Sequence, residues 1–146
     1  AIDDAVAGRP FDPELLAEAG FNELPAAAIV AQWIREGKSI DAVFAADDVS
    51  ARGAVQAVKA AGLRVPEDIA VVGFDDALLS KYITPPLTTV RAPIEEAGRA
   101  AATQLLHLIH DEAADPLTLL PTELVIRQSC GWLNSRVPQQ EVTYSQ

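Results

Sequence analysis

Two pairs of adjacent aspartates are the side chains of this sequence most suited to binding chemistry. Asp47-Asp48 follows the apolar run Val43–Ala46, and Asp75-Asp76 follows the apolar run Ile69–Phe74. Residues with helical spacing separate the two runs, so the sequence predicts a strand–helix–strand unit. Because open α/β sheets bind ligands beyond the carboxyl ends of their strands, we expect a small-molecule site at these acids.

Carboxylates at such an edge accept hydrogen bonds from ligand hydroxyls. Asp75 can hold two neighbouring hydroxyls of a polyol; alternatively it is a turn residue that satisfies nearby backbone N–H groups. Asp47 adds negative charge near Asp75, so either one of the two acids holds a proton or the ligand brings hydrogen-bond donors or positive charge. The competing interpretation of Asp47 is a solvated aspartate at a strand end. Asp48 is expected to cap the following helix, which stabilises by about 1 kcal/mol.

Helix signals surround these acids. A helix is expected over Leu24–Glu36 with Asn22 as its cap, and a second over Val49–Ala61 with Gly62 after its end. A third is expected over Pro93–His110, because proline fits a first turn and an apolar stripe follows at helical spacing. The stripe consists of Ile94, Ala97, Ala101, Leu105, Leu108 and Ile109.

The strands indicate the fold class. Ile69–Val72 is an unbroken apolar run, which is typical of a strand with both faces covered. Strands of this kind that alternate with helices predict an α/β fold with a parallel, doubly wound sheet. Leu87–Val90, Leu117–Leu120 and Glu123–Arg127 are further extended candidates.

Composition points away from direct nucleic-acid binding and membrane insertion. The 146 residues carry a formal net charge of −10, and the basic residues are scattered singly, so contact with a phosphate backbone is not expected. A single cysteine allows no internal disulfide, and no apolar stretch approaches a membrane span. We therefore expect a soluble cytoplasmic protein. The lack of any methionine suggests a piece cut from a longer polypeptide.

Three segments carry a family resemblance: AVFAADDVSARGAVQAVKAAGLRVPEDIAVVGFDD, PPLTTVRAPIEEAGRAAATQLL and PTELVIRQSCG. Together they resemble the effector-binding domain of bacterial transcription regulators of the lactose-repressor and galactose-repressor (LacI/GalR) family. The most specific part is LRVPEDIAVVGFDD followed by PPLTTV. The resemblance implies a periplasmic-binding-protein-like domain of two lobes that holds its ligand between them. This chain would supply most of the C-terminal lobe and one helix of the N-terminal lobe.

The resemblance also implies a domain organisation. Residues 1–130 would form a partial effector-binding domain, with 91–118 crossing to the absent lobe, and 131–146 a flexible tail. By the family pattern Leu15–Ala17 becomes a strand. The Pro93–His110 helix would lose the sheet it normally covers, so its apolar stripe predicts that the chain self-associates or exchanges elements with a second copy.

The same resemblance assigns roles to single residues. Asp75 would bind ligand hydroxyls or ring nitrogens, and Phe21 would stack on the ligand ring. Asp47 stands where relatives often carry asparagine, glycine or serine. Ile94 and Arg91 lie at the lobe crossover, where Ile94 would touch the ligand and Arg91 would pair with a ligand carboxylate or with Asp47 or Asp75. Phe21 could instead anchor the next helix, and Arg91 could be solvated.

Lys81 and Tyr82 match the stretch that relatives use for dimer contact, so a homodimer is expected. The alternative for Tyr82 is a loop aromatic that packs on its own domain. The implied function is allosteric: a small-molecule effector binds between the lobes and controls operator binding through a DNA-binding domain absent from this chain. A sugar is the leading effector class and a nucleoside-like ligand the next.

No catalytic constellation is apparent, so neither enzyme activity nor a cofactor is expected. His107 and His110 lack a third metal ligand, and Cys130 has no histidine at motif distance. Two other interpretations stay open. Asp47, Asp48, Asp75 and Lys81 could serve a receiver-like phosphoacceptor domain that holds Mg²⁺ at paired acids, although their spacing departs from that pattern. The chain could also be a fragment of a periplasmic sugar-binding protein.

Overall fold

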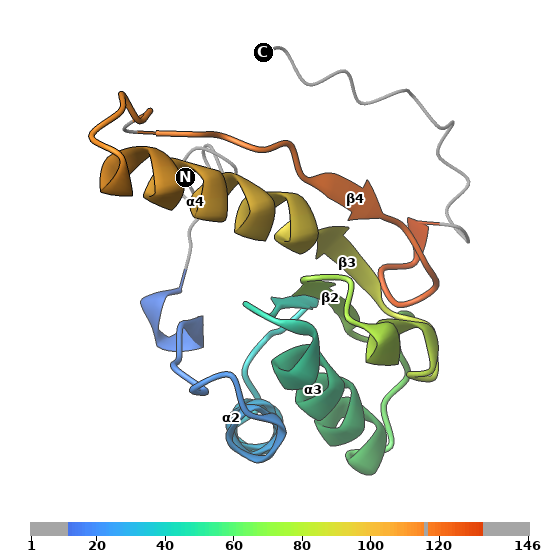
Figure 1. Ribbon diagram of the computed structural model, residues 1–146. Helices are drawn as coiled ribbons and strands as arrows, with labels where there is room; N and C mark the ends of the chain where they lie inside the picture. The colour runs from blue at the N-terminus through green and yellow to red at the C-terminus, as the bar shows by residue number, and fades with distance from the viewer. Residues whose placement is uncertain (1–11, 116, 133–146) are drawn as a thin grey trace.

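A mixed, mainly parallel sheet forms the centre of the fold. The computed structural model describes residues 12–115 and 117–132. Its four strands lie in the order β1-β2-β3-β4. Strands β1 (Ala42–Phe44), β2 (Ala70–Phe74) and β3 (Thr88–Arg91) are parallel, and β4 (Glu123–Val125) pairs with β3 in the antiparallel sense. The predicted α/β class with parallel neighbouring strands is confirmed (Figure 1).

Two helices form a layer against the sheet. Helix α3 (Asp48–Ala60) packs on β1 and β2, and α2 (Glu23–Arg35) packs on α3 (Figure 1). A side chain at Gly53 would collide with the backbone carbonyl of Glu23, so this glycine inside a helix is required by the close approach of the two helices. The predicted Asn22 cap is present, since its Oδ1 accepts a hydrogen bond of 3.1 Å from the amide of Leu24.

The core lies between α3 and the sheet. Apolar residues of α3 and of the central strands meet there, with Leu87, just before β3, fully buried at its centre. The fully or nearly buried members of the core include Val30, Ala51, Ala54, Val55, Val58, Ile69, Val71 and Leu87. This packing fixes the carboxyl ends of β2 and β3, which carry the polar groups described below.

Three local predictions are wrong. The N-cap of α3 is Asp47, not Asp48: its extended backbone lets Oδ1 accept from the amides of Val49 at 2.8 Å and Ser50 at 2.9 Å. The implied strand over Leu15–Ala17 is not formed; the short 3-10 helix η1 (Pro13–Leu15), with Asp12 as its cap, ends at the first residue of that range. Leu117–Leu120 is not a strand either.

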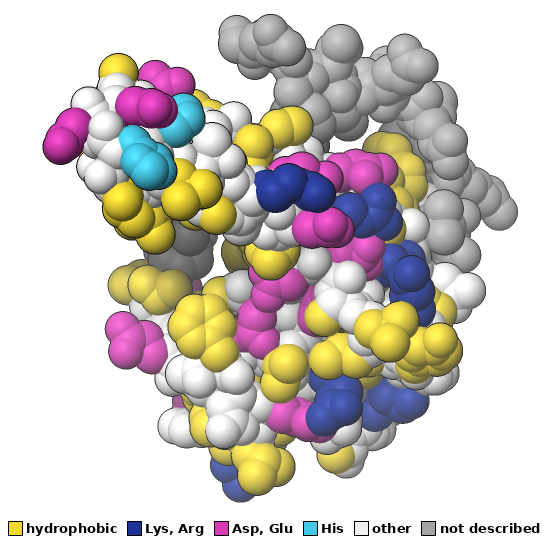
Figure 2. Space-filling model, viewed as in Figure 1, with side chains coloured by type: hydrophobic (Ala, Val, Ile, Leu, Met, Phe, Trp, Pro, Cys, Tyr) yellow, Lys and Arg dark blue, Asp and Glu magenta, His cyan; other side chains and the backbone are white. Residues whose placement is uncertain are grey.

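Two elements expose apolar side chains. Phe44 is 66 % exposed on β1, an edge strand with only β2 beside it among the described residues. No residue of α4 (Ile94–Ile109) is buried, and its apolar stripe faces solvent (Figure 2). Self-association through this helix stays a prediction, which light scattering of the chain tests. Of the predicted tail, 133–146 lies outside the described residues.

Candidate ligand-binding site

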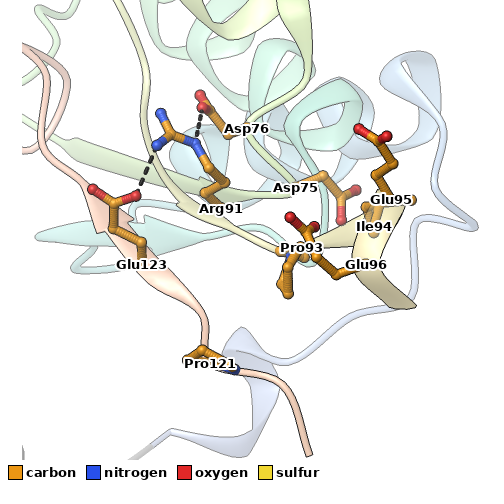
Figure 3. A pocket seen from close by; sticks show the side chains of 10 residues that line it. Asp75, Asp76, Arg91, Pro93, Ile94, Glu95, Glu96, Pro121 and Glu123 are labelled. Carbon is orange, nitrogen blue, oxygen red and sulfur yellow. Dashed lines mark hydrogen bonds and ion pairs between the residues drawn. The ribbon is translucent and has the colours of Figure 1, made fainter. Parts of the chain in front are cut away.

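A hollow of about 440 Å³ opens at the carboxyl ends of β2 and β3. The first turn of α4 and the segment around β4 complete its wall (Figure 3). Its lining residues are Asp75, Asp76, Arg91, Ala92, Pro93, Ile94, Glu95, Glu96, Pro121 and Glu123. The structure therefore brings three of the predicted ligand contacts, Asp75, Arg91 and Ile94, into one hollow at the predicted edge of the sheet.

Asp75 is an acid of this hollow whose carboxylate is open to a ligand. Its amide donates to the carbonyl of Val90 at 2.8 Å, while within residues 12–115 and 117–132 no group donates to its carboxylate. Its φ of 102° is in the region that favours glycine. Asp76 follows with a φ of 53°, so two successive aspartates hold strained backbone at the rim of the hollow.

Arg91 is held by two acids of the chain. Its Nε donates to Asp76 at 2.8 Å and its Nη1 to Glu123 at 2.7 Å (Figure 3). The predicted pairing of Arg91 with Asp47 or Asp75 is therefore wrong, because the guanidinium is bonded instead to Asp76 and to Glu123 of the neighbouring strand β4. Hydrogen bonding to Asp76 raises the pKa of Arg91. The side chain is 47 % exposed, so one face of it still reaches the hollow.

Asp76 is the centre of a nearly buried ion cluster. Its Oδ1 accepts from Arg127 at 2.5 Å and from the hydroxyl of Ser80 at 3.2 Å. Arg127 also donates to Ser80 at 3.0 Å and to the carbonyl of Leu87 at 2.8 Å. Burial acts to raise the pKa of Asp76, but the hydrogen bonds from Arg127 and Arg91 outweigh it and the pKa lies below its usual value.

Asp48 lies beneath this loop and is 1 % exposed. Its Oδ1 accepts from the hydroxyl of Thr89 at 2.6 Å, and its Oδ2 accepts from the amide of Ala77 at 2.7 Å. Burial raises the pKa of Asp48, and these two hydrogen bonds only partly oppose that rise. Sequence reasoning missed this role. The signal was Gly73 in VVGFDD, since a side chain there would collide with the Asp48 carboxylate.

Two predicted contacts lie elsewhere. Asp47 is buried, and its two oxygens accept hydrogen bonds from α3, including one of 2.6 Å from the hydroxyl of Ser50. Phe21 is 74 % exposed on the turn before α2. Neither is among the described residues that line the hollow, and their roles as ligand contacts stay predictions.

The predicted dimer residues lie on a different surface. Lys81 ends the 3-10 helix η2 (Leu78–Lys81), and Tyr82 follows it with 77 % of its surface exposed. Tyr82 borders a second, shallow hollow between α3 and η2. An exposed tyrosine beside a concave surface suits an interface between proteins.

None of the helices that the structure describes is long and apolar enough to cross a bilayer.

The described residues hold no group of three or more His, Cys, Asp or Glu side chains arranged for a metal ion. In particular, the oxygens of Asp47 and Asp48 accept hydrogen bonds from different parts of the chain: those of Asp47 from α3, and those of Asp48 from Thr89 and Ala77. A receiver-like Mg²⁺ site would need these acids to converge on one cation. The geometry does not favour that alternative.

Comparison with known families decides the relationship. The model of the periplasmic binding protein-like domain matches residues 6–130. The chain belongs to this family. It is 37 % identical over 124 residues to the HTH-type transcriptional regulator CelR of Thermobifida fusca, covering 84 % of this chain and 36 % of the relative. It is 38 % identical over 119 residues to the regulator MalR of Clostridium butyricum, covering 82 % of this chain and 36 % of the relative.

Solved structures agree with this relationship. The chain matches a complex of the transcriptional regulator CelR with cellobiose at a TM-score of 0.81 and 36 % identity, covering 87 % of this chain and 40 % of that one. It matches a lac repressor dimer bound to operator and an anti-inducer at a TM-score of 0.71 and 35 % identity, covering 75 % and 33 %. The predicted LacI-family resemblance is confirmed, and these homologues are regulators, not enzymes. The chain spans about a third of the length of the curated relatives it matches.

Proposed function

We propose that this chain is the C-terminal lobe of the effector-binding domain of a LacI-type transcription regulator, and that the hollow at Asp75 binds a sugar. The observation that carries the proposal is the contrast among four aspartates at one edge of the sheet. The carboxylates of Asp47, Asp48 and Asp76 accept hydrogen bonds from the chain, whereas that of Asp75 has no donor among the described residues and lines the hollow. The solved relative with cellobiose supports a sugar as the ligand class.

The chemistry of the hollow suits a polyol. The Asp75 carboxylate can accept from two adjacent hydroxyls, which orients a sugar as well as binding it. Ile94, exposed at the start of α4, offers an apolar surface to the C–H face of a sugar ring. Arg91 is already paired with Asp76 and Glu123, so a ligand carboxylate would have to compete with both. A neutral sugar therefore fits better than an acidic one.

Regulation would follow from the position of this lobe. A ligand that contacts both Asp75 and a second lobe favours one interlobe arrangement, and its effect cannot exceed its differential affinity for the two arrangements. A homodimer joined near Lys81 and Tyr82 would pass that change to DNA-binding parts that lie outside this chain. Operator DNA is thus a partner of the whole regulator, as in the lac repressor relative bound to its operator.

Isothermal titration calorimetry of the full-length protein tests the proposal. The panel is cellobiose, maltose, lactose and guanosine, measured with the wild type, with Asp75→Asn and with Asp68→Asn as a control far from the hollow. Asparagine tolerates a positive φ but cannot accept on both side-chain atoms. We expect at least one sugar to bind, and Asp75→Asn to weaken it by about tenfold or more while Asp68→Asn leaves it unchanged. No binding of any sugar, or equal affinity in Asp75→Asn, would refute the proposal.

A further inference from the structure

The loop that carries Asp75 is fixed through three successive backbone amides. The amide of Asp75 donates to the carbonyl of Val90 at 2.8 Å, that of Asp76 to the hydroxyl of Thr89 at 3.3 Å, and that of Ala77 to the carboxylate of Asp48 at 2.7 Å. Only the first of these acceptors is a backbone group. Besides the bonds of the Asp76 carboxylate to Arg127, Arg91 and Ser80, two side chains, one from α3 and one from β3, therefore hold the backbone of this loop.

The backbone of this loop needs such support. Asp75 and Asp76 have φ values of 102° and 53°, in the region where the backbone of a non-glycine residue is strained. Strain of this kind persists only where surrounding contacts outweigh it. The bonds at the amides of Asp76 and Ala77 are contacts of this kind, and they hold the backbone that directly follows Asp75.

The two side chains act in series. The hydroxyl of Thr89 donates to Asp48 at 2.6 Å, so its single proton is used and its lone pairs face the amide of Asp76. Thr89 is fully buried and Asp48 nearly so, which prevents water from replacing either group. A carboxylate is the side chain that accepts from both Thr89 and Ala77 at once, one bond on each oxygen. An asparagine offers one acceptor and one donor in the same space.

We propose that Asp48 and Thr89 are positioning residues for the ligand site: they do not touch the ligand but hold the loop 75–77 so that the Asp75 carboxylate faces it. This inference rests on the proposed function of the hollow. It explains why a carboxylate is kept in a buried place where its charge is costly. It also explains why a glycine, Gly73, lies opposite the Asp48 carboxylate, since any side chain at that position would displace the carboxylate.

The test compares four variants by two readouts. Thr89→Val removes the hydroxyl at nearly constant volume, Thr89→Ser restores it, and Asp48→Asn removes one acceptor. Ser129→Ala is the matched control, because it removes two buried hydrogen bonds, to Val71 and Thr88, away from the loop. The first readout is hydrogen exchange of the Asp76 and Ala77 amides, measured by NMR on the 146-residue chain. The second is the affinity of the full-length protein for cellobiose.

We expect Thr89→Val and Asp48→Asn to speed exchange at these two amides by about tenfold or more and to weaken cellobiose binding by about fivefold to tenfold. Thr89→Ser should keep both the exchange rates and the affinity within about twofold of the wild type. Ser129→Ala should lower the free energy of unfolding without a specific effect on exchange at these two amides or on the affinity for cellobiose. Unchanged exchange or unchanged affinity in both Thr89→Val and Asp48→Asn would overturn the inference while leaving the sugar site intact. If the wild type itself fails to bind cellobiose, that sugar is excluded as the effector, and the exchange data still decide whether Asp48 and Thr89 hold the loop.

Discussion

Replacing Gly73 by alanine should destabilise the folded protein, because the new methyl group has no room. Gly73 is not among the glycines with a left-handed backbone, so the substitution tests space and not conformation. The added Cβ would lie inside contact distance of the Asp48 carboxylate, 3.0 Å from a methyl of Leu87 and 3.2 Å from the Cβ of Ala51. All three neighbours are buried, so none can move into solvent.

Two contributions make Gly73→Ala destabilising, and a third offsets part of the loss in the free energy of unfolding. Overpacking of a dense core costs about 1–3 kcal/mol. If the Asp48 carboxylate is displaced, its bonds to Thr89 and Ala77 weaken, at about 1.5–3 kcal/mol for each charge-assisted bond that is lost. The smaller conformational freedom of alanine in the unfolded chain offsets about 0.4–1 kcal/mol. With one of these bonds lost, we therefore expect Gly73→Ala to lower the free energy of unfolding by about 1.5–5.5 kcal/mol.

Urea unfolding followed by tryptophan fluorescence measures this effect, since Trp33 packs against the core. Gly98→Ala is the matched control: nothing lies within 4 Å of its added Cβ, so a helical alanine there should stabilise by about 0.5–1 kcal/mol. In an Asp48→Ala background, Gly73→Ala should cost at least about 1 kcal/mol less than in the wild type. A cost below about 0.5 kcal/mol, or the same cost in both backgrounds, would refute the steric role assigned to Asp48.

Three further predictions concern ion pairs and helix packing. Arg127→Met should destabilise by about 3–5 kcal/mol in urea unfolding, because it leaves Asp76 nearly buried without its main partner, and a loss under about 1 kcal/mol would contradict this. Gly53→Ala should push α2 off α3 and destabilise by about 2 kcal/mol or more, so unchanged stability would argue against the close contact. Asp68, hydrogen-bonded to Arg64, should titrate with a pKa of about 2 by NMR; this lowered pKa adds stability above the usual aspartate pKa and loses it as pH falls through about 2. Arg64→Ala should raise that pKa part of the way toward its usual value, because the amide of residue 64 still donates to Asp68, and no change would exclude the Arg64 side chain as a cause.

Local signals predicted the elements of the fold well. Apolar runs marked β1 and β2, and Asn22 and Gly62 marked the ends of helices, because caps and periodicity act over a few residues. The site was predicted in part for a related reason. Asp75 follows β2 and Ile94 begins α4, and the topology of parallel strands brings residues at such positions to one edge of the sheet.

Contacts between distant residues were beyond the reach of local signals. Asp47 and Asp48 are the same residue type in adjacent positions, so capping preference cannot decide between them. The choice is made by Thr89, which lies 41 residues after Asp48 and accommodates the second carboxylate in the core. Arg127 likewise reaches Asp76 across 51 residues. Pairing at these separations depends on the packed sheet.

A crystal structure of the full-length protein with the tightest-binding sugar of the panel tests the central claim most directly. We expect the sugar to occupy the hollow beyond β2 and β3, with a ligand hydroxyl about 2.5–3.0 Å from a carboxylate oxygen of Asp75. A sugar bound at another surface, or a metal ion coordinated by Asp75 in place of a sugar, would contradict it.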